Sequence, residues 1–329
     1  MKQKEKLNWQ MEFLRMGKLL RKEITSLKQF NERQKISGIS KSGDPQFKVD
    51  NIAENFLLKQ IKKISKKTSI AYFSEDKGLV RFAKNPEYLL ICDPIDGSRP
   101  FSAGFESNNF SIALAETNGK DPTDLTFAQI VSGFLLELKT GEYLFAEKGK
   151  GVIQNGAKFQ PKPTRFNSNN LNQLFWSFEF NGTPSRIVHE ILGDLIDTSA
   201  NKGGIFVFNS GSYSISRVIT GQLHAYIDIG NLVLKKFPEL EKEFKSVGSG
   251  SILHLFPYDI AASYIIAKEA HISIADAAGN SLESLSLTDL SAQNQTSCVC
   301  ALNEKLSKKL INEISVNLEK KRKQIAEEQ

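Results

Sequence analysis

The segment Asp93–Ser98, which reads Asp-Pro-Ile-Asp-Gly-Ser, constrains this chain more than any other feature. It follows Tyr88–Cys92, an apolar run that is typical of a buried strand, and its proline and glycine then require a turn. Two carboxylates at the end of a buried strand are costly unless cations neutralise them, and the Gly-Ser pair offers N–H groups and a hydroxyl that suit phosphate. The segment therefore predicts a metal-assisted phosphate site, although the same residue types also form an ordinary turn.

The composition is that of a globular protein large enough for one big domain or two subdomains. The chain has 329 residues, of which 40% are hydrophobic and 24% charged. The charged N-terminus and the lack of any apolar stretch of about 18 residues predict neither export nor a membrane span. Three cysteines are too few for a disulfide framework, so a reducing cytoplasm is the expected location.

The net charge of +6 raises the question of a nucleic-acid partner. Much of the excess lies in lysine pairs such as Lys62-Lys63 and in Lys320–Lys323, which are typical of solvated helix faces. No nucleic-acid-binding motif accompanies them, so such a partner is not expected, whereas attraction of anionic substrates is compatible with the charge. Cys298 and Cys300 alternate on one predicted strand without further cysteines nearby, so neither a zinc site nor a redox site is predicted.

Apolar periodicity predicts alternating helices and strands, and hence a layered α/β architecture. In the first half, helices are predicted around 9–27 and 51–61 and strands at 70–73, 88–92, 110–115, 130–136 and 143–146, with turns at Thr140-Gly141 and Asn155-Gly156. In the second half, strands are predicted at 204–208 and 224–227 and helices at 212–220, 258–270 and from 303 onward. We expect an N-terminal α+β subdomain over 1–160 and a C-terminal α/β subdomain over 161–329.

Two predicted strands end in acidic residues. Glu75 follows the strand at 70–73, and Asp93 follows the strand at 88–92. If both strands lie in one sheet, their ends bring Glu75, Asp93 and Asp96 together. Asp259 begins a small-residue helix, a position that the helix dipole favours for a carboxylate, so it is either a third ligand or an ordinary first-turn acid.

These motifs resemble those of the inositol monophosphatase superfamily, from about residue 10 to the final helix. Asp93–Ser98 matches its Asp-Pro-[Ile/Leu]-Asp-Gly-[Thr/Ser] motif, and Tyr258–Ala262 resembles its Trp-Asp-x-Ala-[Ala/Gly] motif. Glu75-Asp76 matches its acidic pair, and Glu147–Gly151 resembles its glycine-rich hairpin. The resemblance implies an αβαβα sandwich of the inositol monophosphatase/fructose-1,6-bisphosphatase type, with the site where two subdomains meet.

The resemblance also implies a ligand set for Mg²⁺. Glu75, Asp93 and the carbonyl of Ile95 would bind one ion, and Asp93, Asp96 and Asp259 would bind a second. All are oxygen ligands, which suit a hard octahedral cation.

Further roles follow from the same resemblance. Asp50 matches an acid that orients water at a third Mg²⁺, although it is also placed to be the N-cap of a helix from Asn51. Glu75 and Ser98 would position the attacking water and Asp93 would bridge the ions, which makes these three the expected catalytic residues. The N–H groups of Gly97 and Ser98 would hold phosphate oxygens.

The substrate side is expected to use a second group of residues. Tyr213 stands where the family has a small residue, so it either reaches the substrate or packs in the core. The connection Gly230–Leu255 is longer than usual and would either wall the pocket or mediate assembly. The residues expected to bind phosphate or substrate are Gly97, Ser98, Ser210, Gly211, Ser212, Tyr213 and Asp228.

The sequence thus predicts a Mg²⁺-dependent phosphomonoesterase that acts on a small anionic metabolite. Inositol monophosphate and a sugar phosphate such as fructose 1,6-bisphosphate are the leading substrates, with histidinol phosphate and 3′-phosphoadenosine 5′-phosphate as alternatives. A catalytically weak regulatory or RNA-associated protein is the alternative of another class, and the presence of all four principal acids argues against it. The resemblance implies a homodimer.

Overall fold

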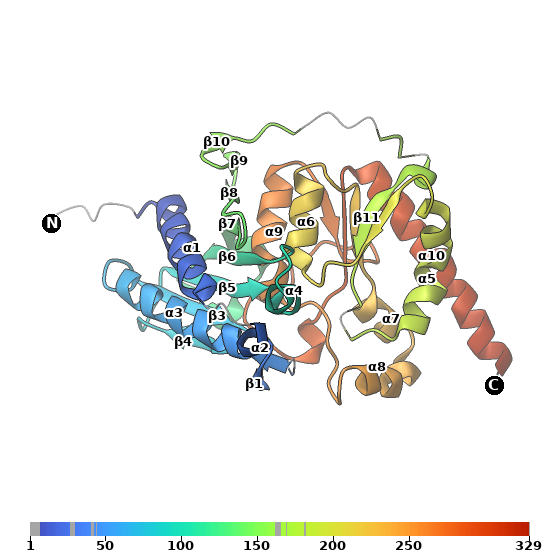
Figure 1. Cartoon of the computed structure of the whole chain (residues 1–329), viewed down its shortest axis with the longest axis horizontal. Coiled ribbons are helices and arrows are strands. Elements are labelled where there is room, and N and C mark those ends of the chain that lie inside the picture. Colours follow the sequence, from blue (N-terminus) through green and yellow to red (C-terminus); the bar gives the residue numbers. More distant parts are fainter. Residues whose placement is uncertain are drawn as a thin grey trace.

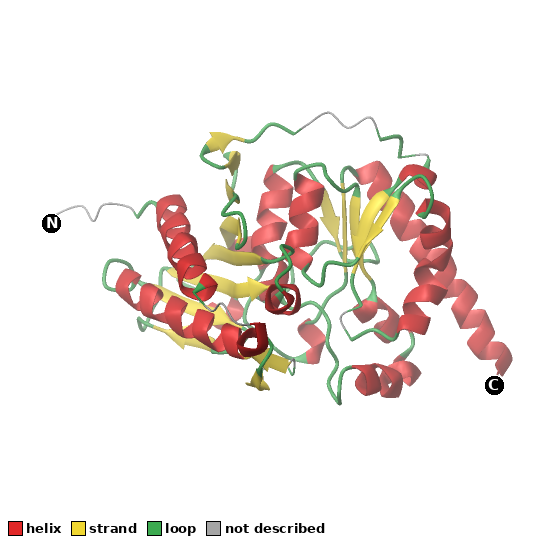
Figure 2. Ribbon diagram, in the orientation of Figure 1, coloured by secondary structure: helices red, strands yellow, loops and turns green. Residues whose placement is uncertain are grey.

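Five layers of alternating helices and sheets make up the protein, as a computed structural model shows for residues 7–26, 30–40, 43, 45–161, 166–168, 170–180 and 182–328. From one side to the other they are a pair of helices, an eight-stranded sheet, a second pair of helices, a five-stranded sheet and a third pair of helices (Figures 1 and 2). The expected αβαβα sandwich is confirmed.

The larger sheet contains all five strands that apolar periodicity predicted in the first half of the chain. Its strand order is β10-β9-β8-β7-β6-β5-β3-β4, in which β3 and β5 are parallel and the other neighbours are antiparallel. Its strands are β3 (Ile70–Ser74), β4 (Gly78–Arg81), β5 (Tyr88–Asp96), β6 (Asn109–Glu116), β7 (Ile130–Glu137), β8 (Tyr143–Glu147), β9 (Gly151–Gln154) and β10 (Ala157–Lys158). Because β3 and β5 are parallel neighbours, their carboxyl ends meet at one edge of the sheet. This is the arrangement that was expected to bring Glu75 and Asp93 together.

The first helix layer consists of α1 (Trp9–Thr25) and α3 (Lys48–Ile64). The periodic apolar side chains of α1, among them Phe13 and Leu20, are buried against Leu90 and Phe110 of the sheet. The helix predicted around 51–61 begins earlier, at Lys48. The short α2 (Phe30–Arg33) and the two-stranded pair β1 (Ile36–Ile39) and β2 (Pro45–Phe47) precede it.

The middle layer consists of α6 (Gly211–Ile219) and α9 (Pro257–Glu269). α9 is buried nearly all round, since it lies between the two sheets. Gly133 of β7 allows this close approach, because a Cβ there would lie 2.5 Å from Ile265 Cγ2 and 2.6 Å from the carbonyl oxygen of Ala262. The position of α9, which begins at the Asp259 motif, therefore depends on a glycine in the sheet.

The smaller sheet has the order β12-β11-β13-β15-β14. Its strands are β11 (Phe175–Phe178), β12 (Gly204–Phe206), β13 (Ala225–Asp228), β14 (Ser273–Ala275) and β15 (Cys298–Ala301). One face packs on α5 (Ser185–Ser199) and α10 (Glu304–Glu328) through Trp176 and Val299. Cys298 and Cys300 share the opposite face, toward the middle layer, as their alternation predicted, and both thiols are buried.

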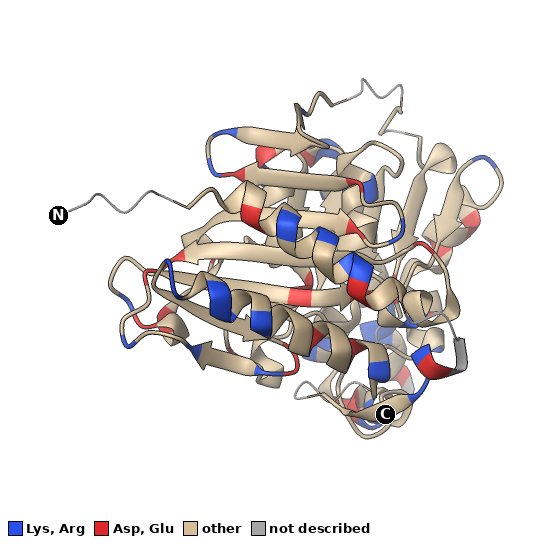
Figure 3. Cartoon of the chain, turned by 60° about the vertical axis from the view of Figure 1, so that its left-hand side comes forward, with Lys and Arg blue, Asp and Glu red and all other residues tan. Residues whose placement is uncertain are grey.

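The long connection after β13 forms its own small helical unit. It contains α7 (Gly230–Lys236), a turn of 3₁₀ helix at Pro238–Leu240 and α8 (Glu241–Val247). Figure 1 shows α8 at the same lower edge of the molecule as α2 and β1. In the described residues no helix is both long and apolar enough to cross a membrane. Basic and acidic positions are interspersed along the outer helices in the view of Figure 3.

Candidate active site

The turn at the end of β5 is built by an irregularity in the sheet. The pairing of β5 with β6 shifts between Asp93 and Asp96, so both acids lie at the end of the strand. Gly97 then adopts a φ of +91°, and a Cβ there would lie 2.6 Å from the carbonyl oxygen of Ser107. Only glycine fits such a position. The helix α4 (Ser98–Ala103) starts immediately afterwards.

A cavity of about 310 Å³ opens at this turn and is rich in carboxylates. Among the described residues that line it, Arg99 is the only lysine or arginine. The acidic residues that line it are Asp50, Glu54, Glu75, Asp76, Asp93, Asp96 and Asp259. Such an excess of negative charge in a partly buried cavity is costly unless protons or cations neutralise it.

Most of the residues singled out in the sequence line this cavity, and three do not. Those that line it are Asp50, Glu75, Asp93, Ile95, Asp96, Gly97, Ser98, Ser210, Gly211 and Asp259. Ser212, Tyr213 and Asp228 are not among its lining residues. Ser212 instead donates its backbone N–H to Asp96 Oδ2 at 2.7 Å, and Asp228 accepts from the backbone N–H of Gly230 at 3.2 Å.

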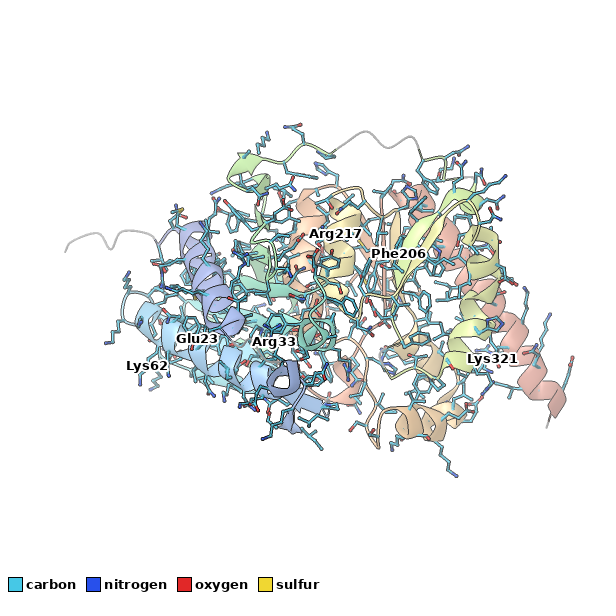
Figure 4. All side chains as sticks on the ribbon, viewed as in Figure 1. Glu23, Arg33, Lys62, Phe206, Arg217 and Lys321 are labelled. Atoms are coloured by element: carbon cyan, nitrogen blue, oxygen red, sulfur yellow. The ribbon has the colours of Figure 1, made fainter. Side chains whose placement is uncertain are left out.

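Tyr213 lies on α6 and is not among the residues that line the cavity. Its half-buried ring lies 4.6 Å from the guanidinium carbon of Arg217 and 5.2 Å from the ring centroid of Phe208. Arg217, labelled in Figure 4, in turn forms a buried ion pair with Glu137. The ring is thus packed on neighbouring side chains, and its contact with substrate stays a prediction.

Hydrogen bonds fix one oxygen of each principal aspartate. Asp93 Oδ1 accepts from the backbone N–H of Ile95 at 2.9 Å, and Asp259 Oδ2 accepts from that of Phe256 at 2.6 Å. Asp96 Oδ2 accepts from Ser210 Oγ at 2.6 Å. Within the described residues, no three acidic, histidine or cysteine side chains already converge as a metal-binding group. The ligand set therefore stays a prediction.

The electrostatics of the cluster nevertheless suit cations. Burial raises the pKa of Asp93 well above its usual range, and the charges of Asp96, Asp259 and Glu75 raise it further. Burial also raises the pKa of Asp96, against the hydrogen bonds from Ser210 and Ser212. Carboxylates that repel one another favour divalent cations, and an all-oxygen donor set matches Mg²⁺. The residues present therefore fit the expected metal.

Asp50 links the first turn of α3 to the motif. The N-cap of α3 is Phe47, so the expectation that Asp50 is the N-cap is wrong. Asp50 lies three positions later, where its Oδ2 accepts from the backbone N–H of Phe47 at 2.8 Å. Its Oδ1 accepts from Ser98 Oγ at 2.6 Å. The Asp50 carboxylate thus caps the first turn of α3 with one oxygen and accepts the hydrogen bond of the Ser98 hydroxyl with the other.

Comparison with known proteins decides the family. The model of the inositol monophosphatase family matches residues 3–319. The chain belongs to this family. Members are phosphoric monoester hydrolases that generally depend on Mg²⁺, and this chain is accordingly an enzyme of that hydrolase class.

Individual relatives within the inositol monophosphatase family are distant. A fructose-1,6-bisphosphatase/inositol-1-monophosphatase from Methanocaldococcus jannaschii is 26% identical over 295 residues, which cover 88% of this chain and 95% of the relative. A bifunctional NADP phosphatase/NAD kinase from Methanococcus maripaludis is 26% identical over 309 residues, or 91% of this chain, but this chain spans only 48% of that relative. A solved inositol monophosphatase–fructose 1,6-bisphosphatase superposes with a TM-score of 0.67 at 26% identity and covers 93% of this chain and 100% of its own.

The sequence analysis missed two further acids, one that lines the cavity and one that supports a lining segment. Glu54 lies one turn after Asp50 on α3, accepts from Ser74 Oγ at 2.8 Å and has a pKa that burial raises to about 7. Glu179 accepts from the backbone N–H groups of Asn209 at 2.9 Å and Ser210 at 3.4 Å. Glu179 follows β11 directly, so an acid at the end of an apolar strand was a usable signal for it.

Proposed function

We propose that the protein is a Mg²⁺-dependent phosphomonoesterase that hydrolyses a small phosphorylated metabolite, with inositol monophosphate or a sugar phosphate such as fructose 1,6-bisphosphate as the first candidates. The observation that carries this proposal is the carboxylate-lined cavity at the end of β5, beside Gly97 and Ser98. The names of the relatives support the choice of substrates.

The metal-binding residues in this proposal are those that the family motifs identify. Glu75, Asp93 and the carbonyl of Ile95 would hold one Mg²⁺, and Asp93, Asp96 and Asp259 a second, while Asp50 would orient water at a third. When bound, the cations polarise phosphoryl oxygens and lower the pKa of water. Ser210 Oγ and the Ser212 N–H keep Asp96 in a fixed orientation for this role.

The protein's own groups would orient the attacking water. Ser98 Oγ lies 2.6 Å from Asp50 Oδ1 and 3.0 Å from the carbonyl oxygen of Ile95, and both are acceptors. Since the hydroxyl donates its one proton to these acceptors, its lone pairs remain available to accept a hydrogen bond from water. Ser98 and Glu75 would thus fix the direction of the attacking water, and the N–H groups of Gly97 and Ser98 would bind phosphate oxygens in the transition state.

A nucleotide phosphate is a second candidate substrate. It is favoured by the relatives named bifunctional NADP phosphatase/NAD kinase, although this chain spans about half of their length. 3′-Phosphoadenosine 5′-phosphate and histidinol phosphate remain alternatives, whereas a regulatory or RNA-associated role lacks any observation in its favour. We further propose that the enzyme is cytoplasmic and acts as a homodimer, and that 1–160 and 161–329 are its subdomains.

Phosphate release from a panel of phosphomonoesters, with Mg²⁺ and with EDTA, tests the proposal. The panel comprises inositol 1-phosphate, fructose 1,6-bisphosphate, histidinol phosphate, NADP, 3′-phosphoadenosine 5′-phosphate and glycerol 2-phosphate. We expect Mg²⁺-dependent turnover of at least one compound and its loss in Asp93→Asn. Turnover that persists in EDTA, or in Asp93→Asn, would contradict the proposed site.

A further inference from the structure

A second cavity lies at the end of α6 that is remote from Asp96. It has a volume of about 220 Å³ and is lined by residues of β8, β9 and α6, among them Leu144, Gln154 and Arg217. None of its described lining residues also lines the carboxylate-rich cavity. The volume is below the roughly 300–1,000 Å³ of sites for drug-sized molecules, so a ligand there must be small.

The charge of this second cavity opposes anions. Arg217 is the only lysine or arginine among the described residues that line it, and it forms a buried ion pair with Glu137. Glu142 adds a second carboxylate, so the described lining carries two negative charges and one positive charge. A phosphate or carboxylate in the second cavity would be repelled, whereas an uncharged ligand would not.

The uncharged lining groups suit a ring that carries hydroxyl groups. Amide and hydroxyl side chains both donate and accept hydrogen bonds, as an alcohol does. Tyr143 and Phe159 add aromatic rings, which can pack on the C–H groups of such a ligand. The amide, serine and threonine side chains that line the second cavity are Asn109, Gln154, Gln160, Gln222, Ser216 and Thr220. This combination matches a neutral cyclic polyol.

The larger sheet connects the second cavity with Asp96. Asp96 pairs with Asn109 of β6, and Asn109 pairs with Glu137 of β7. Both Asn109 and Glu137 line the second cavity. The side-chain amide of Asn109 also lies 3.2 Å from Ser212 Oγ, on the helix that holds Asp96. A ligand beside Asn109 would therefore contact a strand neighbour of Asp96.

Helix α6 provides a second connection to Asp96. At its start, Ser210 Oγ and the Ser212 backbone N–H donate to Asp96 Oδ2 at 2.6 and 2.7 Å. Farther along the same helix, Ser216 and Arg217 line the second cavity. Because α6 has only nine residues, a ligand that contacts its last turns restricts the segment that orients Asp96.

We propose that the second cavity is a binding site for a neutral cyclic polyol, and that a ligand there strengthens Mg²⁺ binding by fixing α6 and thus Asp96. Such a coupling is reciprocal, so Mg²⁺ should strengthen polyol binding by the same factor. The polyol site is separate from the proposed phosphomonoesterase function, whereas the effect on Mg²⁺ rests on the proposed metal site.

Ligand-observed NMR titration with myo-inositol, in EDTA, tests the binding site. An uncharged ligand of this size should bind wild type with a Kd on the order of millimolar. Quinate has a similar ring but carries a carboxylate, so it should bind at least about tenfold more weakly. In Gln154→Ala the Kd for myo-inositol should rise about fivefold through the loss of a hydrogen bond. Gln222→Trp places a bulky ring in the second cavity and should abolish binding.

Two further variants show where myo-inositol binds. Gln173 is exposed and lines neither cavity, so Gln173→Ala should bind myo-inositol as wild type does. Asp93→Asn alters the carboxylate-rich cavity alone and should also leave myo-inositol binding unchanged.

Calorimetric titration of Mg²⁺, with and without saturating myo-inositol, tests the coupling. In wild type the Kd for Mg²⁺ should fall about fivefold when myo-inositol is bound. In Gln222→Trp, myo-inositol should leave the Kd for Mg²⁺ unchanged.

The outcomes separate this inference from the proposed function. If wild type binds no myo-inositol at tens of millimolar, or if binding is lost in Asp93→Asn and kept in Gln222→Trp, the inference is overturned. Binding that leaves the Kd for Mg²⁺ unchanged in wild type would overturn the coupling. If wild type hydrolyses no phosphomonoester and binds no Mg²⁺, the proposed function fails, while the NMR titration still decides whether the polyol site exists.

Discussion

Glu179 supports the loop that orients Asp96, and its replacement by glutamine should alter how stability depends on pH. The side chain is 3% exposed. Burial raises its pKa from 4.5 to about 8, against the backbone N–H groups of Ser210 and Asn209, and the charges of Asp228 and Asp96 add to the rise. In the unfolded chain the same carboxyl titrates near its ordinary pKa. Between these pKa values the folded protein keeps a proton that the unfolded chain releases, so stability falls as the pH rises.

The size of the effect follows from the separation of the two pKa values. At about 1.4 kcal/mol per pH unit, Glu179 lowers the free energy of unfolding by on the order of 4 kcal/mol between about pH 5 and pH 8. That is a large share of the roughly 5–15 kcal/mol that holds a typical domain together. Glutamine has no charged form, so in Glu179→Gln this part of the pH dependence disappears. Glu54, whose pKa is also raised, still contributes in the same direction.

Urea unfolding in EDTA at several pH values from 5 to 8.5 measures the effect. The stability of wild type should fall more steeply with pH than that of Glu179→Gln. Glu87→Gln, at an exposed position, serves as the control and should follow wild type. Parallel curves for wild type and Glu179→Gln would refute the reasoning, because they would show that the buried carboxyl binds no extra proton in the folded state.

Three further predictions concern the site itself. Ser98→Ala should lower kcat by about 10²-fold, whereas Ser98→Thr keeps the hydroxyl beside Asp50 and should retain activity within about tenfold. Equal losses of kcat in the two variants in steady-state assays would contradict the role of the hydroxyl. In wild type, Mg²⁺ at 100 times its Kd should stabilise the fold by about 2.7 kcal/mol and so raise the melting temperature. Asp96→Asn should abolish most of this rise, and an unchanged rise would show that Asp96 is not a ligand. Gly133→Ala should lower the free energy of unfolding by about 1–3 kcal/mol and weaken Mg²⁺ binding, because the new methyl group displaces α9. Gly38→Ala is the control, since the nearest atom to a Cβ there is 3.5 Å away. Urea unfolding measures the stability and calorimetric titration measures Mg²⁺ binding.

The sequence predicted the parts of the site that local patterns encode. The acids at the ends of β3 and β5 could be placed together because each follows an apolar run that is recognisable as a buried strand. The packing of Tyr213 could not be predicted from the sequence, because it depends on Arg217 and Phe208, and both lie outside the segment 211–213. The sequence left open whether the connection Gly230–Leu255 lies beside the cavity, because this depends on contacts of Leu253 and His254 with Gly182 and Gly230.

The arrangement of the layers explains why such a costly cluster of acids can persist. Asp93 and Asp96 lie at the end of strand β5, and Asp259 lies in the first turn of helix α9, which packs on that sheet. In each aspartate, one carboxylate oxygen accepts a hydrogen bond from a backbone N–H or a serine hydroxyl. Their mutual repulsion acts on a frame that burial of apolar residues in both neighbouring layers already holds in place. The carboxylates therefore cannot move apart to relieve the repulsion, and the free energy can be recovered only by proton uptake or by cation binding. We infer that the affinity of the site for divalent cations depends on the rigid positions of these carboxylates. Gly133 allows α9 to pack closely on the sheet, so its replacement should affect metal binding even though it is remote from the site.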